Sequence, residues 1–239
     1  MNIIKNYSTK EKIRLFGLFL IYIIFCVYTI HLIKYEKNIY SKILFLNILI
    51  LFMFISLWSE YLKFLYQKSI YYLNVELDCN KAIYYFEKLI RKDFFKSYNK
   101  TFLIFKILYN IYKENYLESI EILNKNYKFF RSSLDNLLIQ KYTYFFCNYK
   151  LNNKNNVEKY YSDLLKLKKS KNDKIKVSPL YNWEFIDAIY YKSIYNFEKS
   201  KYYFENTNTK NMNLRELIIY YKEYEDLLNK LNLTNQAKK

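Results

Sequence analysis

Two long apolar runs dominate the first quarter of the chain. Residues 15–33 form an uncharged run of 19 residues, and residues 43–59 form a second one of 17. At about 1.5 Å per residue, helices of these lengths come close to spanning a hydrocarbon core of about 30 Å. The pattern predicts a transmembrane hairpin over residues 15–61, with spans at about 15–33 and 43–61. Two buried helices of a soluble protein are the alternative, but they need more covering surface than the remaining chain offers.

After residue 60 the apolar positions fall three and four residues apart. Such spacing places them on one helix face, whereas the alternating runs typical of strands are few. The prediction is an all-α protein: a basic N-terminus (1–14), the hairpin, a helical repeat domain (62–232) and a flexible tail (233–239). Helices are expected at 60–77, 80–92, 95–113, 116–131, 133–150, 155–169, 180–195, 198–206 and 212–231.

A weak internal repeat organises the helical domain. A small residue, an aromatic or aliphatic residue and a third bulky residue recur at spacings of four, which places them on one helix face. The first positions of successive copies lie 37, 38 and 43 residues apart. The copies are Ala82, Phe86 and Ile90; Ser119, Leu123 and Tyr127; Val157, Tyr161 and Leu165; and Ser200 with Phe204.

On these residues the region 62–206 resembles the tetratricopeptide repeat family, whose helical hairpins keep a small residue in the second helix and an aromatic residue one turn later. The resemblance implies a right-handed α-α superhelix, or solenoid, with a groove that binds peptides or protein segments. The expected turn glycine and closing proline are missing, and Leu108 stands where the first helix usually has a small residue. An irregular helical bundle is the alternative.

Three segments near the end of the domain have sequence patterns that predict a specific structure or contact. Residues 212–232 carry an apolar stripe that suits a terminal capping helix, with a coiled-coil dimer as the alternative. Ser178 and Pro179 have the pattern of a helix start. The segment before them is basic and is interpreted either as a solvated linker or as a contact for anionic lipid. The stripe comprises Leu214, Leu217, Ile218, Tyr221, Leu228 and Leu231, and the basic segment comprises Lys168, Lys169, Lys171, Lys174 and Lys176.

Charge indicates which side of the membrane each segment faces. The net charge is +17. The chain has 35 Lys, 4 Arg, 30 Tyr and few Gly, Pro and Ala, which is the composition that an AT-rich genome encodes. Binding of a polyanion is therefore only one explanation of the excess of cations over anions. Cations near the span ends favour both termini and the helical domain on the cytoplasmic side of the cell membrane. Lys5, Lys10, Lys12, Arg14, Lys63 and Lys68 flank the hairpin, against Lys34, Lys37 and Lys42 in its connector.

The sequence offers no catalytic site, cofactor site or metal site. His31 is the one histidine, and Gly17 is the one glycine, so histidine catalysis and phosphate-cradling glycine loops are excluded. Cys26, Cys79 and Cys147 lack metal or disulfide spacing. The acidic residues Glu60, Asp78, Asp93, Glu118 and Asp187 occur singly among lysines, as expected of solvated helix faces. The chain is therefore predicted not to be an enzyme.

The leading hypothesis is a membrane-anchored, non-enzymatic adaptor that presents a helical-repeat surface to a protein or peptide. One alternative is an accessory or immunity component of a peptide (bacteriocin or pheromone) secretion or signalling system. Another is a basic helical domain that binds anionic lipid or nucleic acid. Membrane lipid and a protein or peptide are the expected partners; nucleic acid is disfavoured, and a homo-oligomer remains open.

Overall fold

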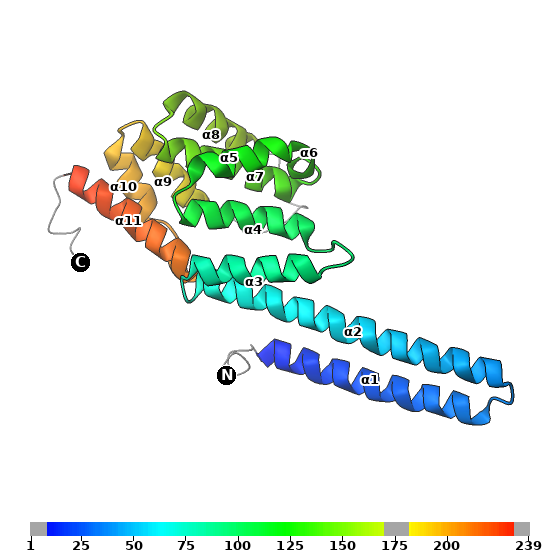
Figure 1. Cartoon of the computed structure of the whole chain (residues 1–239). Helices are drawn as coiled ribbons and strands as arrows, with labels where there is room; N and C mark the ends of the chain where they lie inside the picture. The colour runs from blue at the N-terminus through cyan, green and yellow to red at the C-terminus, as the bar shows by residue number, and fades with distance from the viewer. Residues whose placement is uncertain (1–8, 170–181, 232–239) are drawn as a thin grey trace. The chain divides into compact units, whose positions relative to one another are not determined.

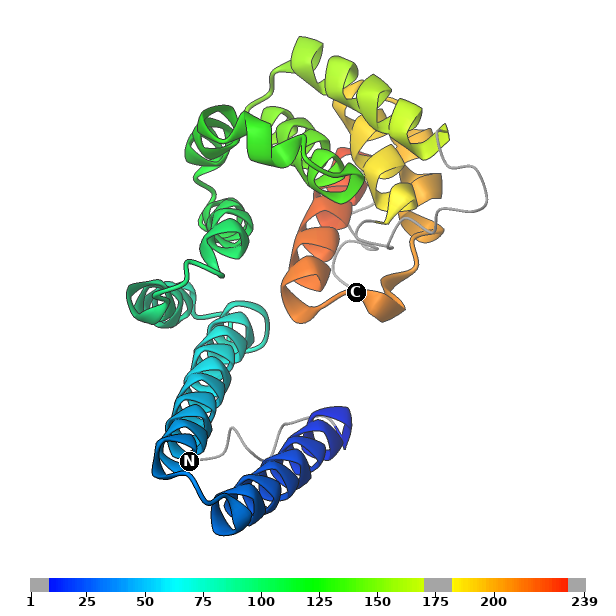
Figure 2. The ribbon, with the colours of Figure 1, turned by 90° about the vertical axis from the view of Figure 1, so that its right-hand side faces the viewer.

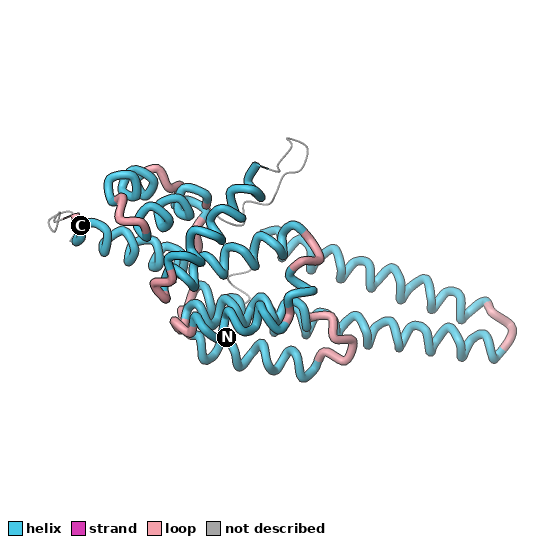
Figure 3. The backbone as a smooth tube through the Cα atoms, turned by 90° about the horizontal axis from the view of Figure 1, so that it is seen from above, coloured by secondary structure: helices cyan, strands magenta, loops and turns pink. Residues whose placement is uncertain are grey.

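The computed structural model describes residues 9–169 and 182–231. Figure 3 shows that these residues form helices joined by short loops, with no strand among them. The predicted all-α class is therefore confirmed for the described ranges. Figure 1 labels the helices, whose bounds are α1 Thr9–Tyr35, α2 Ile39–Asn74, α3 Cys79–Lys92, α4 Asn99–Tyr112, α5 Tyr116–Lys125, α6 Tyr127–Phe130, α7 Leu134–Lys150, α8 Lys154–Lys169, α9 Trp183–Ser193, α10 Phe197–Glu205, the 3-10 helix η2 Thr209–Asn211 and α11 Leu214–Lys230.

Most expected helices lie within a few residues of the observed ones, with two differences. The segment 60–77 is not a separate helix, because α2 runs from Ile39 through Glu60 to Asn74 without a break. Neither glycine nor proline stands between the apolar run and its continuation, so nothing ends the helix there. The segment 116–131 is divided at Asn126 into α5 and α6. The helix start expected at residues 178–179 and the tail at 233–239 lie outside the described residues.

The chain divides into two compact units, Met1–Lys68 and Ser69–Lys239. In the first unit, α1 and the beginning of α2 form an antiparallel helical hairpin (Figure 1). Arg14 donates two hydrogen bonds of 3.0 and 2.9 Å to the Glu60 carboxylate at its open end. Farther along, the ring of Phe52 packs against Phe25 at a centroid distance of 4.4 Å.

Both helices of this hairpin are long and apolar enough to cross a membrane. The spans are Phe16–Tyr35 and Ile39–Asn74, with mean hydropathies of 2.3 and 2.1 in their most apolar stretches. Only 6% and 0% of the residues in those stretches are buried, so the described part of the chain leaves their apolar surface uncovered. Each helix exposes apolar side chains on several faces, as lipid-facing helices do.

The second unit contains four helical hairpins whose turns each have a residue in the left-handed region, and three of these turns share one hydrogen-bond pattern. In the hairpin α4–α5, Glu114 has a φ of 61°, which lies in the left-handed region. The Asn115 amide donates to Asn110 O at 2.8 Å, and the Glu114 amide donates to Ile111 O at 3.1 Å. This is the Schellman pattern that satisfies the last carbonyls of a helix. Asn152 and Tyr195 form the same turn in α7–α8 and α9–α10, and Leu77 has a φ of 59° between α2 and α3.

The residue after each left-handed position starts the second helix of its hairpin. It is Asp or Asn in all four copies, the residue types preferred at a helix N-cap. Asp78 and Asn196 accept hydrogen bonds from the amides of Lys81 and Lys199 at 2.9 and 3.2 Å. Asn115 and Asn153 occupy the same position in the other two hairpins. The left-handed positions are 37, 38 and 43 residues apart, the same intervals as between the first positions of the predicted copies.

The small residue of each repeat lies in the tightest part of its hairpin. Ala82, Ser119 and Ser200 are fully buried. Ser200 Oγ donates to Ala188 O at 2.8 Å, and Ser119 Oγ approaches Ile107 O at 3.4 Å, so each serine lies against the backbone of the facing helix. The first two positions of every predicted copy are buried. The third position was expected on the same helix face, and this is wrong for Tyr127, because α5 ends at Lys125 and the half-exposed Tyr127 begins α6.

Candidate binding site along the C-terminal helix

Helix α11 lies against the turns of the preceding hairpins. Figure 2 shows α3 to α10 following one another along an arc, with α11 on the inner side of that arc. Helix α11 begins in a capping box formed by Asn213 and Glu216. At this end, Arg215 donates to the carbonyl of Leu77, in the first turn, at 2.6 Å and lies 5.2 Å from the ring centroid of Tyr112.

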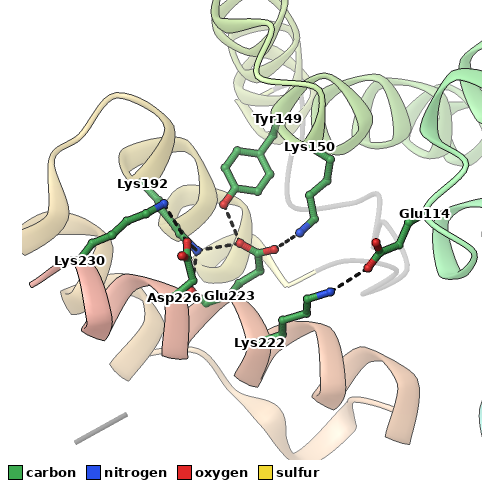
Figure 4. Close-up of polar contacts among 8 residues, drawn as sticks. All are labelled: Glu114, Tyr149, Lys150, Lys192, Lys222, Glu223, Asp226 and Lys230. Carbon is green, nitrogen blue, oxygen red and sulfur yellow. Dashed lines mark hydrogen bonds and ion pairs between the residues drawn. The ribbon is translucent and has the colours of Figure 1, made fainter. Parts of the chain in front are cut away.

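The next turns of α11 reach the later hairpins. Lys222 pairs with Glu114 of the second turn at 2.8 Å. Glu223 accepts a hydrogen bond of 2.6 Å from Tyr149 Oη and a hydrogen bond from Lys150 Nζ, both at the end of α7 (Figure 4). One polar stripe of α11 therefore contacts the ends of three earlier hairpins.

Lys192 completes this arrangement from the last turn of α9. Its Nζ lies 2.8 Å from Glu223 Oε2 and donates to Glu223 O at 2.6 Å. It also lies 2.9 Å from Asp226 Oδ2, which in turn pairs with Lys230 (Figure 4). Because the left-handed turns end α7 and α9 beside α11, their terminal lysines meet its carboxylates, and a cation in the last helical turn is also favoured by the helix dipole.

The charges of this cluster change the protonation of its members. Burial alone would raise the pKa of Glu223, but the nearby charges of Lys192 and Lys150 outweigh it and hold that pKa below its ordinary value. Burial also raises the pKa of Tyr149, and the Glu223 charge adds to the effect, so the phenol stays protonated and donates its hydrogen bond. A hydrogen bond from Lys222 lowers the pKa of Glu114. The carboxylates in the cluster therefore remain ionised near neutral pH.

A hollow of about 360 Å³ opens beside these ion pairs, between α11 and the ends of α7 and α9. A smaller hollow of about 110 Å³ adjoins it and shares Lys150, Lys222 and Glu223 with it. Lys154 Nζ lies 4.1 Å from the centroid of the exposed Tyr195 ring at the edge of the larger hollow. Cations exceed anions around that hollow: its charged lining residues are Lys150, Lys154, Lys192, Lys222, Lys230, Glu223 and Asp226.

The apolar stripe predicted to cap the domain is only partly correct. Leu228 is buried as predicted, but Leu214, Ile218 and Tyr221 are exposed. The buried face of α11 is rotated and instead contains Tyr220, Leu227 and the charged Glu223. The rotation lets α11 direct its polar residues at the hairpin turns, so it combines packing on α9 and α10 with a row of ion pairs.

Several residues singled out in the sequence lie elsewhere. Asp93 and Asp187 are buried, contrary to the solvated faces expected of them. Asp187 accepts a hydrogen bond of 2.7 Å from Tyr161 Oη, and Lys168, the first residue of the basic segment, lies 3.7 Å from its other oxygen. His31 is exposed on α1, with its ring 4.5 Å from that of Tyr35. These groups do not converge on one site.

Within residues 9–169 and 182–231, no group of three or more His, Cys, Asp or Glu side chains could hold a metal ion. Sequence reasoning did not find the Glu223 cluster. The sequence did contain a signal for it: Glu223 lies three positions after Tyr220 and four before Leu227, and this spacing places it on the same helix face as these two buried residues.

No protein-family model matches the chain, and no match was found among the curated proteins or the solved structures.

Proposed function

We propose that this chain is a membrane-anchored, non-enzymatic adaptor. The apolar hairpin holds it in the cell membrane, and the helical hairpins with α11 bind an acidic segment of a protein partner on the cytoplasmic side. The observation that carries this proposal is the lysine-rich hollow of about 360 Å³ beside α11. Ligand sites in proteins commonly occupy about 300–1,000 Å³, so a short peptide segment fits this volume.

The anchor is supported by two uncovered apolar helices in the first unit. Its orientation is argued from charge: Lys5, Lys10, Lys12 and Arg14 precede the first span and Lys63 and Lys68 follow the second run, whereas Lys34, Lys37 and Lys42 lie in the connector. Cytoplasmic segments near span ends carry the excess of Lys and Arg, so the open end and the second unit are assigned to the cytoplasm.

The acidic character of the partner follows from which ion pairs could be exchanged. The side chains of Lys222 and Glu114 are both mostly exposed, and those of Lys230 and Asp226 are each about half exposed. Exposed pairs of this kind contribute only about 0–1 kcal/mol, so an incoming carboxylate can replace Glu114 at Lys222, or compete with Asp226 for Lys230, at little cost. Lys154 supplies a further cation, held over Tyr195. The buried pair of Lys192 with Glu223 would remain intact beneath the bound segment.

Site-specific photo-crosslinking in the full-length, membrane-expressed chain tests this function. A photoreactive residue replaces Lys154 in one variant and Lys159 in a matched control. Both lysines are exposed on α8 and lie over a tyrosine ring, but only Lys154 lines the hollow. We expect one protein to be captured from position 154 and not from 159, and the capture to be lost in the background Lys222→Glu with Lys230→Glu.

Equal capture from both positions, or capture that survives the two charge reversals, would reject the hollow as the binding site. No captured protein from a folded, membrane-inserted chain would reject the adaptor function. Circular dichroism at 222 nm shows whether each variant keeps its helices, so a folding defect is distinguished from a loss of binding.

A further inference from the structure

The loop between α3 and α4 presents two phenylalanines to solvent. Phe94 and Phe95 are each 74% exposed. Large apolar side chains are normally buried, and two adjacent ones at the tip of a loop form a patch that is unfavourable in water. Phe86 of α3, in contrast to Phe94 and Phe95, is fully buried, and its ring packs on that of Phe105 at a centroid distance of 4.3 Å.

The backbone holds these rings outward through Asp93. The buried Asp93 carboxylate accepts a hydrogen bond of 2.7 Å from the Tyr98 amide, and its carbonyl accepts one of 3.1 Å from the Lys96 amide. Lys96 has a φ of 55°, in the left-handed region that is unfavourable for a residue with a side chain. The loop is therefore a defined turn with both ends fixed by Asp93, and its exposed tip is part of the folded structure.

The surface around this tip is cationic. Arg91, Lys92, Lys96 and Lys100 are all exposed. Asp93 is the one acidic residue between positions 88 and 113, and it is buried. An apolar tip ringed by cations complements a bilayer surface with anionic lipids, because the cations are attracted to lipid phosphates while aromatic rings settle at head-group level.

We propose that residues 93–98 form a lipid-binding loop that inserts Phe94 and Phe95 into the head-group region of an anionic bilayer. Lipid is favoured over a protein partner because the exposed rings are flanked by cations with no exposed acidic residue among them, and because the same chain carries two helices apolar enough to cross a membrane. The loop lies at the opposite end of α4 from the turn at Glu114, and hence apart from the hollow beside α11. The proposal does not rest on the adaptor function.

An environment-sensitive fluorophore on Phe95→Cys tests the insertion. The full-length chain, carrying Cys26→Ser, is reconstituted in nanodiscs of neutral phosphatidylcholine, or with phosphatidylglycerol added. Cys79 and Cys147 are buried, and the background chain without an added cysteine measures residual labelling. Leu117→Cys is the matched control, because Leu117 is 70% exposed and lies in the first turn of α5, beside the turn at Glu114.

We expect a blue shift of the fluorophore at position 95, and quenching by brominated acyl chains, only in discs with phosphatidylglycerol. Both signals should be lost in Lys92→Glu with Lys96→Glu and Lys100→Glu, and weakened at 1 M salt, where the Debye length falls to about 3 Å. The fluorophore at position 117 should respond to neither disc.

Three results would overturn the proposal: no response at position 95, an equal response at both positions, or a blue shift without quenching by brominated lipid, which would indicate a protein cover. If the chain stays outside the discs, the same fluorophore is measured against added vesicles of the same two compositions, and the same criteria apply. Loss of crosslinking from position 154 would count against the adaptor function alone.

Discussion

Lys192 and Glu223 form an ion pair in which both side chains are almost completely buried. The two atoms lie 2.8 Å apart, and the side chains are 1% and 4% exposed. Removing one partner of a buried pair leaves an uncompensated charge and typically costs about 3–5 kcal/mol. We therefore expect Lys192→Met to lower the free energy of unfolding of the second unit by that amount. Urea denaturation of the full chain in mild detergent, followed by circular dichroism, measures it.

The matched control for this variant removes both charges. Replacing a complete buried pair by apolar residues of similar volume is often neutral. Because Lys150 and Tyr149 also contact Glu223, the double variant Lys192→Met with Glu223→Leu should recover part of the loss and not all of it. A double variant that is less stable than Lys192→Met would show that Glu223 stabilises the fold mainly through Tyr149 and Lys150 and not through Lys192.

The depressed pKa of Glu223 predicts how stability changes with pH. A carboxylate whose folded pKa lies below its unfolded value of about 4.3 stabilises fully above that value. The contribution is lost as the pH falls through the folded pKa, because the protonated carboxyl no longer attracts Lys192 and Lys150. Unfolding at a series of pH values from 7 to 3 should therefore show a decline below about pH 4.3 that is smaller in Glu223→Gln.

The exposed carboxylate of Glu198, in the first turn of α10, provides the comparison. Glu198→Gln should leave the decline with pH nearly unchanged. If Glu223→Gln and Glu198→Gln flatten the curve equally, the acid sensitivity arises from overall charge repulsion and not from the cluster.

The left-handed turn at Glu114 predicts a stabilising glycine. A residue with a side chain costs about 1–2 kcal/mol in the left-handed conformation, and glycine does not. Glu114→Gly also removes the exposed pair with Lys222. Glu114→Gln removes the same pair but keeps the strain, so the glycine variant should exceed it in free energy of unfolding by about 1 kcal/mol.

Glu121 is the control for this substitution. It lies within α5, where glycine has no conformational advantage, and it also forms an exposed pair, with Lys125. Glu121→Gly should be less stable than Glu121→Gln by about 1 kcal/mol. The same sign at both positions would contradict the left-handed assignment of Glu114.

Much of the helical framework could be predicted from the sequence, because helix positions depend on local spacing. Apolar residues three and four apart located the helices, and the small residue of each copy, such as Ser200, gave the period of the turns. The continuity of α2 was missed because a span at about 43–61 and a helix at 60–77 were expected as separate elements, although Glu60 lies within one helix and its carboxylate pairs with Arg14 inside the first unit. A charge that has a partner does not have to end a helix.

The candidate site could not be predicted in the same way, because its contacts join distant positions. Glu223 meets Tyr149 and Lys192 across 74 and 31 residues, and Arg215 reaches Leu77 across 138. No spacing within one helix encodes such pairs. The rotation of α11 decides which of its residues are buried, and it depends on the three-dimensional positions of the hairpin turns.

The apolar hairpin predicts a strong dependence of membrane insertion on the position of a charge. Leu51 lies at the centre of the second apolar run and is exposed to the surroundings. An arginine at a span centre costs about 2.5–3.5 kcal/mol of insertion free energy. Tyr40, at the connector end of α2, is also exposed, and an arginine there can reach the head groups. Leu51→Arg should therefore reduce the fraction of chain that resists alkaline carbonate extraction, whereas Tyr40→Arg should not. If the two variants are extracted equally, or the unmodified chain is released by carbonate, the hairpin does not span the bilayer.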